Sequence, residues 1–460
     1  METVLICGYG ISGRGAAALA ASQGKEIVIA DERGSLEMRS AAAELRKRHA
    51  AVRTIFNWKE GLVLPPCGTV VVSPGIRRES PLCKAARKAL LPGGEWLSEL
   101  EYALRNVHCP FLSITGTNGK TTTTELTTAL LRANGLAAES AGNIGAALSE
   151  CALEAKQRGA GFLVIETSSF QLENISAFPA CPAAILNLAS DHIDRHGSFE
   201  EYARTKFKVF AEPLEASRRI MNSNLRPWLE KFLPGTAVTT FSAADPEADF
   251  TLKGTVIHFH DRPVFDTAAG QLRGLHNAEN MMAALALLRA VQGDDALFRA
   301  ETAAALGSFR SGPHRMEIFA ECRGVTYVND SKATNPHAVN AAVRRFASGR
   351  NLLLVLGGLD KGMDFSELEV SFPAIKQAFL TGSCREALFS ELSGRVKCKL
   401  SSDFASAVHD ACAAAAPGDV VMLSPATASM DQFKNYAERG DAFKRLVRET
   451  LRRMNPGEKF

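Results

Sequence analysis

The chain has 460 residues and a formal net charge of +3, with 46% hydrophobic and 22% charged residues. This length exceeds a single hydrophobic core, so we expect two to four domains. The small net charge gives no indication of bulk electrostatic binding to nucleic acid, so we expect no nucleic-acid partner.

The ten cysteines are scattered singly and form no Cys-x-x-Cys pair. This usage is typical of reduced thiols rather than of a disulfide framework or a structural zinc site. The first residues run directly into a short apolar segment, so we expect no signal peptide. No apolar run approaches the length of a membrane span. We therefore expect a cytoplasmic protein without a transmembrane helix.

A dinucleotide-type βαβ unit is predicted at the start of the chain. An apolar strand at residues 4–7 precedes a full G-x-G-x-x-G at residues 8–13, an alanine-rich helix at 16–22 and a strand at 27–30 that ends at Asp31. The pattern suggests an NAD-linked oxidoreductase. However, the glycines indicate a phosphate near a helix N-terminus and not the nucleotide that carries it. Since no hydride-transfer site follows, the oxidoreductase stays an alternative.

A further strand at residues 70–73 ends at Ser73, on the sheet edge where open α/β sheets bind ligands. The sequence LPGG at 91–94 and the short helix after it indicate a domain boundary near residue 100. We therefore predict a Rossmann-like domain over residues 1–98.

The second domain begins with a predicted phosphate loop. A strand at 111–114 is followed by GTNGKTT at 116–122 and by a helix that Gly135 closes. Backbone N–H groups and the helix dipole favour an anion there, Lys120 adds a cation, and Thr121 can offer a hydroxyl to Mg²⁺. The full phosphate-loop pattern needs a glycine at Ile114, so an ordinary turn with an exposed lysine stays possible.

Two polar segments follow the next strands. The strand at 162–165 ends at Glu166, which is placed to hold Mg²⁺ against nucleotide phosphates, although it could also be a plain strand-end acid. After a strand at 183–188 comes DHIDRH at 191–196. Its two histidines lie four apart, but Ile193 replaces the glutamate of a zinc protease, so a second metal or a phosphate contact fits better.

Two helices are predicted in the rest of the second domain. A helix at 202–209 carries Lys206 and Lys208, which by default are solvated cations. Before a long apolar helix at 281–291, Asn277 could be a helix cap and Asn280 could reach an adenine or a phosphate. A Gly/Ser-rich stretch at 307–312 marks the second boundary.

A third α/β domain follows, with buried strands at 325–329, 352–356 and 420–424 and polar clusters at their ends. Arg315, Lys332 and Lys361 place cations on this sheet edge, which favours an anionic, carboxylate-bearing ligand. The predicted fold class is α/β in three domains: a Rossmann-like domain over 1–98, a P-loop-type mononucleotide-binding domain over 99–311, and a Rossmann-like open sheet over 312–460.

This combination predicts an ATP-driven amide ligase. One domain would hold a nucleotide-bearing substrate, the second ATP and the third a small anion. Transfer of the γ-phosphoryl group to a carboxylate gives an acyl phosphate, which an amine then attacks. A non-enzymatic alternative is a binding module in which ATP closes the domains on a ligand without turnover.

The serial motifs resemble the Mur ligases. They are GTNGKTT at 116–122, GNIG at 142–145, ETSS at 166–169, DHIDR at 191–195, HNAEN at 276–280 and PHR at 313–315. Within the family, DSKATN at 330–335 and the segment at 423–440 are similar to the members that add D-glutamate. The resemblance implies UDP-N-acetylmuramoyl-L-alanine and D-glutamate as substrates, in peptidoglycan precursor synthesis, and we expect a monomer.

The resemblance also implies roles for single residues. Lys120, Glu166, His192 and Lys206 would be catalytic, with ATP, two Mg²⁺ ions and carbon dioxide, as a carbamate on Lys206, as cofactors. The metal ligands would be Thr121, Glu166, His192 and carbamylated Lys206. ATP would contact Gly116, Thr117, Asn118, Gly119, Lys120, Thr121, Thr122, Asn280, Arg315 and, through its ribose, Asp330. The two substrates would contact Ser12, Asp31, Arg33, Ser73, Asn143, Ser168, Lys332, Thr334, Lys361, Ser429 and Tyr436.

Overall fold

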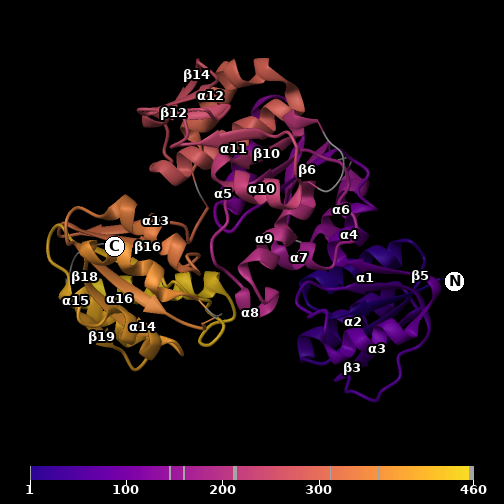
Figure 1. Ribbon diagram of the computed structural model, residues 1–460. Coiled ribbons are helices and arrows are strands. Elements are labelled where there is room, and N and C mark those ends of the chain that lie inside the picture. Colours follow the sequence, from indigo (N-terminus) through magenta and orange to yellow (C-terminus); the bar gives the residue numbers. More distant parts are fainter. Residues whose placement is uncertain are drawn as a thin grey trace. The chain divides into compact units, whose positions relative to one another are not determined.

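The computed structural model describes residues 2–143, 147–158, 161–210, 215–310, 312–360 and 363–454 (Figure 1). The chain divides into two compact units. The first comprises Met1–Leu188, Glu200–Gln271 and Asn277–Phe309, and the second comprises Ala189–Phe199, Leu272–His276 and Arg310–Phe460. The first unit contains an N-terminal and a middle sheet, and the second unit contains the C-terminal sheet.

The N-terminal sheet is parallel throughout, in the order β3-β2-β1-β4-β5. Its strands are β1 (Thr3–Cys7), β2 (Glu26–Asp31), β3 (Val52–Phe56), β4 (Cys67–Val72) and β5 (Leu90–Ser98). Residues of α1 (Ile11–Ser22) and α2 (Leu36–Arg48) pack into the core on one face, and residues of α3 (Pro81–Ala89) pack on the other. The predicted strands and helix of this region are confirmed, and the LPGG segment lies within β5.

The middle sheet has the order β14-β13-β12-β11-β10-β9-β6-β8-β7, with antiparallel pairing at β12-β13 and β13-β14 and parallel pairing elsewhere. Its strands are β6 (Phe111–Thr115), β7 (Ala138–Gly142), β8 (Phe162–Glu166), β9 (Ala183–Ile185), β10 (Arg219–Asn222), β11 (Thr239–Ser242), β12 (Phe250–Lys253), β13 (Val256–Phe259) and β14 (Arg262–Asp266). The antiparallel extension from β12 to β14 was not predicted from the sequence.

The helices of the middle region connect and cover these strands. They are α4 (Glu99–Leu104), α5 (Lys120–Ala133), α6 (Leu148–Arg158), α7 (Ser169–Glu173), α8 (Ile193–His196), α9 (Phe199–Phe207), α10 (Arg226–Phe232), α11 (Leu275–Gln292) and α12 (Ala300–Ser308). Helix α11 begins at Leu275, so Asn277 lies inside the helix and the prediction that it caps the helix was wrong. Short 3-10 turns are η1 (Lys208–Phe210), η2 (Ala216–Arg218), η3 (Ser223–Leu225), η4 (Thr267–Ala269) and η5 (Asp294–Phe298).

Helix α4 belongs to two cores at once. Leu100 and Leu104 pack in the core of the middle sheet, whereas Tyr102 packs in that of the N-terminal sheet. The buried Glu99 carboxylate accepts from Ser149 N at 3.1 Å and from Ser149 Oγ at 2.6 Å. Burial raises the pKa of Glu99. The expected boundary near residue 100 therefore falls where one short helix packs against both sheets.

The C-terminal sheet has the order β15-β16-β20-β17-β18-β19, parallel except for β15. Its strands are β15 (Glu317–Cys322), β16 (Val325–Asn329), β17 (Leu352–Gly357), β18 (Ile375–Thr381), β19 (Cys398–Leu400) and β20 (Val420–Leu423). Its helices are α13 (Pro336–Phe346), α14 (Arg385–Leu392), α15 (Phe404–Ala414), α16 (Tyr436–Met454) and the 3-10 helix η6 (Phe365–Ala374). Hydrophobic clusters cover both faces of this sheet.

Within each sheet, the polar motifs lie at the same edge. In a parallel sheet, the loops that leave the carboxyl ends of the strands lie along one edge. The loops after β1, β6 and β16 carry the predicted phosphate-binding and polar motifs.

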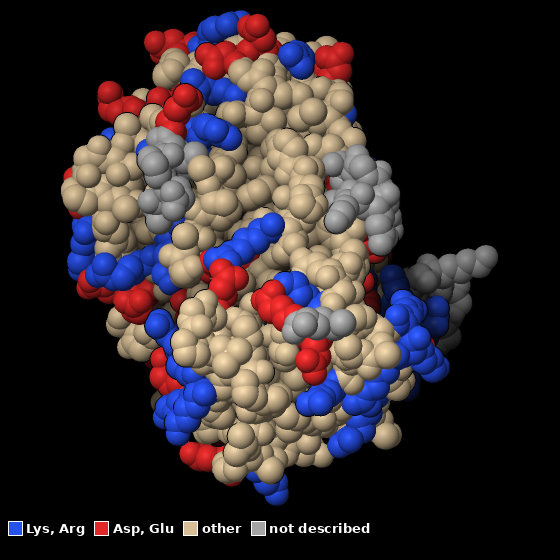
Figure 2. Space-filling view, turned by 90° about the vertical axis from the view of Figure 1, so that its right-hand side faces the viewer, with Lys and Arg blue, Asp and Glu red and all other residues tan. Residues whose placement is uncertain are grey.

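Among the described residues, no helix is both long and apolar enough to cross a membrane. Figure 2 shows one face of the molecule, on which Lys and Arg side chains lie among Asp and Glu side chains.

Candidate active site

Hydrogen bonds with nearby side chains fix the backbone of the N-terminal glycine loop. Asp31 accepts from Tyr9 N through Oδ2 at 2.7 Å and from Arg33 N through Oδ1 at 2.8 Å. Ser73 Oγ donates to Gly8 O at 2.7 Å. A Cβ on Gly13 would lie 1.9 Å from Gly8 O, so the third glycine of the motif is required for the helix to approach the strand. Three predicted substrate residues are therefore brought together here.

Space for a ligand exists at the second glycine. No heavy atom lies within 4 Å of a Cβ built on Gly10, which is the N-cap of α1 and has no side-chain cap. Ser12 lies partly buried in the first turn of the same helix. The free N–H groups of such a helix end suit a phosphate. The loop can thus receive the diphosphate of a nucleotide-linked substrate.

The second loop is a phosphate-binding turn between β6 and α5. Gly119 is the N-cap of α5 with φ +82°, and no side chain caps the helix. Lys120 Nζ donates to Gly116 O at 2.8 Å and to Thr117 O at 2.7 Å, so its ammonium lies over the loop. Asn187, which was not predicted from the sequence, accepts from Thr117 N through its carbonyl and from Asn118 N through Oδ1.

Glu166 lies beside this loop. Its Oε2 accepts from Thr121 Oγ1 at 2.7 Å, and its Oε1 accepts from Asn143 Nδ2 at 2.9 Å. A hydroxyl next to a carboxylate is an oxygen donor set of the kind that Mg²⁺ takes, with waters and phosphate oxygens completing the octahedron. The residues present therefore fit the ion. Among the described residues, no three His, Cys, Asp or Glu side chains group closely enough to hold a metal.

Asn143 was predicted to contact the nucleotide-linked substrate, and in this structure it donates to Glu166. Ser168, predicted as a second such contact, is the N-cap of α7 and forms a capping box with Gln171. That short helix directly follows β8, so Ser168 helps to fix the chain just after Glu166.

Lys206 is buried and Lys208 is partly buried, so the default expectation that both are solvated cations was wrong. Lys206 is 1% exposed, and its Nζ donates to Gly116 O at 2.9 Å. Its Nζ also lies 4.7 Å from the ring centroid of Tyr202, whose hydroxyl is 2.9 Å from Thr117 Oγ1. Lys208 donates to Leu172 O and Glu173 O at the end of α7, a favourable place for a cation.

Asn280 also lies against the phosphate loop. A Cβ on Gly119 would lie 2.3 Å from Asn280 Oδ1, and that oxygen accepts from Thr123 Oγ1 at 3.3 Å. The amide of Asn280 donates to Asn277 Oδ1 at 3.3 Å. In the first unit, the loop at 116–122, Asn143, Glu166, Lys206 and Asn280 thus lie close together.

The second unit contributes a separate cluster around Asp330. This side chain is 4% exposed and accepts from Ser424 Oγ at 2.9 Å and from Met316 N at 3.1 Å. Burial raises the pKa of Asp330 to about 7, although Ser424, Met316 N–H and the Arg315 charge oppose the shift. Arg315 lies between two residues with positive φ, and its Nε is buried without a hydrogen-bond partner among the described residues. A ligand can supply that missing acceptor.

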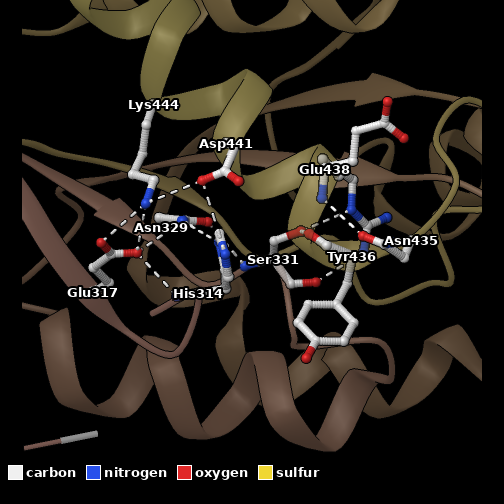
Figure 3. Close-up of polar contacts among 10 residues, drawn as sticks. His314, Glu317, Asn329, Ser331, Asn435, Tyr436, Glu438, Asp441 and Lys444 are labelled. Atoms are coloured by element: carbon white, nitrogen blue, oxygen red, sulfur yellow. Dashed lines mark hydrogen bonds and ion pairs between the residues drawn. The ribbon is translucent and has the colours of Figure 1, made fainter. Parts of the chain in front are cut away.

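A polar network holds the backbone of the PHR motif (Figure 3). His314 N donates to Glu317 Oε2 at 2.9 Å, and Asn329 Nδ2 lies 2.9 Å from His314 Nδ1 and 3.0 Å from Glu317 Oε2. Lys444 from α16 forms ion pairs with Glu317 and Asp441. Burial lowers the pKa of His314, so the imidazole is neutral at neutral pH. The network fixes the residue that precedes Arg315.

The predicted amino-acid contacts lie in the loops after β16 and β20. Lys332 Nζ is 4.9 Å from the ring centroid of Tyr436, and Ser331 Oγ donates to Tyr436 O at 2.7 Å. Thr334 is partly buried and Ser429 is buried. Lys361 lies outside the described residues.

Arg439, which was not predicted from the sequence, joins these two loops. It is 1% exposed and donates to Ser331 Oγ and O, Ala428 O and Thr427 O at 2.9–3.1 Å. Burial lowers its pKa to about 10, so the guanidinium stays charged at neutral pH. From the sequence, an arginine within a long amphipathic helix is expected at the surface. Tertiary packing instead places the Arg439 guanidinium against the loops after β16 and β20.

His192 lies in the short segment that the second unit takes from the middle of the sequence. It is the N-cap of α8 with φ +56°, and its Nε2 is 3.5 Å from Asp191 Oδ1. A left-handed conformation is costly for a residue with a Cβ and is often retained at functional positions.

Comparison with known proteins assigns the family. Residues 114–288 match the Mur ligase middle domain, and residues 314–427 match the Mur ligase glutamate ligase domain. The chain is 34% identical to the UDP-N-acetylmuramoylalanine–D-glutamate ligase of Geobacter metallireducens over 97% of each chain. It is 36% identical to the ligase of the same name from Anaeromyxobacter dehalogenans over 98% of each chain.

Solved structures share the fold at low sequence identity. A MurF ligase from Thermotoga maritima aligns over 93% of this chain and 96% of its own, with 16% identity and a TM-score of 0.60. MurF from Acinetobacter baumannii aligns over 92% of this chain and 90% of its own, with 13% identity and a TM-score of 0.61. On the full-length relatives and the two matching domains, the chain belongs to the Mur ligase family of ATP-dependent amide ligases.

Proposed function

We propose that this chain joins D-glutamate to UDP-N-acetylmuramoyl-L-alanine at the expense of ATP, in the cytoplasmic stage of peptidoglycan precursor synthesis. The observation that carries the proposal is the whole-length similarity, at 34% and 36% identity, to two ligases named for this reaction. The site supports it, because a phosphate loop with Lys120 and a second cluster with Lys332 suit ATP and an amino-acid carboxylate.

Each domain binds a different ligand. Residues 1–98 bind the UDP-linked substrate through the loop at Gly10, with Ser12, Asp31, Arg33 and Ser73 around it. Residues 99–311 bind ATP at the loop at 116–122, with Asn280. Residues 312–460 bind D-glutamate through Lys332, Thr334, Lys361, Ser429 and Tyr436, and supply Arg315 and Asp330 to ATP. The chain acts as a monomer.

The reaction has two steps. The L-alanyl carboxylate attacks the γ-phosphorus of ATP, ADP leaves, and an acyl phosphate forms. The amine of D-glutamate, having lost a proton, then attacks the acyl carbon, and phosphate leaves as the amide bond forms. Lys120 neutralises charge that builds on the transferring oxygens. Mg²⁺ held by Thr121, Glu166 and His192 would supply further charge neutralisation.

Lys206 is proposed to be carbamylated by carbon dioxide. Its Nζ and that of Lys120 donate to the same carbonyl oxygen, Gly116 O, at 2.9 and 2.8 Å. Two ammonium groups at one buried oxygen repel each other strongly, because the interior screens charge poorly. A carbamate on Lys206 removes that repulsion and presents oxygen atoms that Mg²⁺ can bind.

The test of the reaction is phosphate release with UDP-N-acetylmuramoyl-L-alanine and ATP, measured against a panel of amino acids. Release should depend on D-glutamate and be far slower with L-glutamate, D-alanine or a diamino acid. Release that is independent of D-glutamate, or that prefers another amino acid, contradicts the proposal.

The carbamate has its own test. With ¹³C-bicarbonate, the wild-type protein should show a carbamate resonance that Lys206→Ala lacks. Lys206→Ala should be inactive, and bicarbonate or short-chain acids should restore part of its turnover. Lys208→Met, two residues further along the chain, is the matched control and should keep the resonance. Activity of Lys206→Ala close to wild type would remove this lysine from the mechanism.

A further inference from the structure

A hollow of about 610 Å³ lies on the α3 face of the N-terminal sheet. Residues 57–66 connect β3 to the parallel strand β4 without a helix, although such crossovers usually contain one. Trp58 and Leu64 of this connection pack in the same core as Leu82 and Ala86 of α3. The hollow lies between this loop and α3, where a crossover helix is missing.

The hollow has an apolar floor and a basic rim. Trp58 and Leu64 are 3% and 4% exposed and belong to the floor. Lys84, Arg87 and Lys88 from α3 line the rim, against a single acid, Glu60. The rim therefore carries an excess of positive charge and favours an anionic partner.

The loop presents two aliphatic side chains outward. Leu62 is 51% exposed and Val63 is 90% exposed. Trp58 Nε1 donates to Leu62 O at 3.1 Å, and Leu62 N donates to Lys59 O at 3.1 Å, so a defined turn supports this apolar tip. Pro65 and Pro66 follow and stiffen the return to β4. The tip is thus held away from the core by ordered backbone.

We propose that this surface, made of residues 57–66 and α3, docks on a membrane that contains anionic lipids. The apolar tip would enter the interface while the lysines and Arg87 contact lipid phosphates. A lipid surface fits better than a protein partner. Protein hot spots centre on aromatic side chains that can be buried by the partner, whereas here Trp58 is already buried and the exposed tip is aliphatic.

The experiment is co-sedimentation of the full chain with vesicles of phosphatidylcholine, alone or with about 30% phosphatidylglycerol. We expect binding to the mixed vesicles that weakens as salt rises from about 0.1 M to about 1 M, and little binding to phosphatidylcholine alone. The double substitution Lys84→Gln and Lys88→Gln should weaken binding at least about tenfold, because each basic residue near the surface contributes about fivefold. The pair Leu62→Ser and Val63→Ser should weaken it as well.

Matched controls come from α2, on the opposite face of the same sheet. Leu36 is 87% exposed, so Leu36→Ser removes a comparable apolar group and should leave binding unchanged. Lys47 is an exposed cation of α2, and Lys47→Gln removes a comparable charge. Tryptophan emission of Val63→Trp should shift to the blue with mixed vesicles and stay unchanged with neutral ones. All these positions are exposed, so circular dichroism melts should match wild type.

The outcomes separate cleanly. Binding that needs phosphatidylglycerol, falls with the loop and α3 variants and survives the α2 variants supports the proposal. Equal sedimentation with and without anionic lipid overturns it, and so does binding that the loop and α3 variants leave intact. Absence of binding to the mixed vesicles also overturns it and leaves a protein as the partner of this surface. None of these results bears on which amino acid the ligase adds.

Discussion

The two glycine loops share a topology and differ in the charge around them. Each lies between a parallel strand and a helix whose N-terminus has no side-chain cap. The N-terminal loop is closed by Asp31 and Ser73, an acid and a hydroxyl. At the middle loop, Lys120 and Lys206 both donate to Gly116 O. Under the proposed function, the same strand–turn–helix arrangement therefore binds a phosphate at the first loop and activates one at the second.

The loop with the more complete glycine motif is thus not the loop with the side chains suited to catalysis. The G-x-G-x-x-G at residues 8–13 is complete because Gly13 must let α1 approach β1. The loop at 116–122 lacks one glycine of the full pattern yet carries Lys120, Thr121 and the nearby Glu166. Catalysis of phosphoryl transfer depends on positioning and charge, so these side chains matter more than the count of glycines.

Lys120→Ala removes the cation that distinguishes the middle loop from the N-terminal loop. We expect kcat to fall about 10²–10³-fold, because the charge that faces the transferring phosphoryl group is lost. Binding of the UDP-linked substrate, measured by calorimetry, should be unchanged. The matched control is Arg14→Ala in the first turn of α1, whose guanidinium pairs with the exposed Glu37 and should change kcat less than about threefold. Loss of substrate binding in Lys120→Ala would mean that the loop is structural.

The N-terminal loop can be dissected with two alanines. Gly13→Ala would place a methyl 1.9 Å from Gly8 O, so we expect destabilisation by about 1–3 kcal/mol or more, seen as a lower melting temperature. Gly10→Ala meets open space, and Gly10 has a φ of −77° that alanine tolerates. It should melt like wild type and bind the UDP-linked substrate about tenfold more weakly, since the methyl fills the space of the ligand. Unchanged binding would show that no ligand approaches Gly10.

Sequence reasoning was successful where the local pattern is strong. The strands β1, β2, β6, β8, β16 and β17 were all predicted, because buried parallel strands are continuous apolar runs. The β12–β14 extension was missed, since its short strands mix polar and apolar residues without a clear period.

The site was predicted mainly through residues that belong to recognisable motifs. Asn187, Tyr202 and Arg439 were missed because each acts on a loop distant in sequence. The burial of Lys206 was also missed, since a lysine in a helix with acidic and basic neighbours looks solvated. Contacts between distant segments depend on tertiary packing, which a local pattern does not contain.

A pH series separates the two binding sites, because only ATP binding should depend on Asp330. Burial raises the pKa of Asp330 to about 7 from an ordinary value near 3.9. The ionised form of Asp330 is the better acceptor for ribose hydroxyls. KM for ATP should therefore rise by up to about tenfold as the pH falls from 8 to 6. KM for the UDP-linked substrate should not change over this pH range. Asp330→Asn should flatten the ATP profile, and an unchanged profile would contradict the assignment.

Ionisation of Asp330 favours ATP binding but lowers the stability of the fold. Between about pH 4 and pH 7 the folded chain keeps a proton that the unfolded chain releases. The contribution of Asp330 to stability is therefore fully present below about pH 4 and is lost as pH rises to about 7. Urea melts of the wild type and of Asp330→Asn should differ in slope across this window. Function thus gains from the ionisation that costs stability.

The smallest effects give a crossed test of the two loops. Ser73→Ala removes the hydroxyl that donates to Gly8 O, and Thr117→Val removes the hydroxyl that meets Tyr202. Each hydrogen bond contributes about 1 kcal/mol, which corresponds to about fivefold. Ser73→Ala should raise KM for the UDP-linked substrate and spare ATP, whereas Thr117→Val should raise KM for ATP and spare the other substrate. If either variant shifted both constants equally, the loops would act as one site, and their different charges would not divide binding from activation.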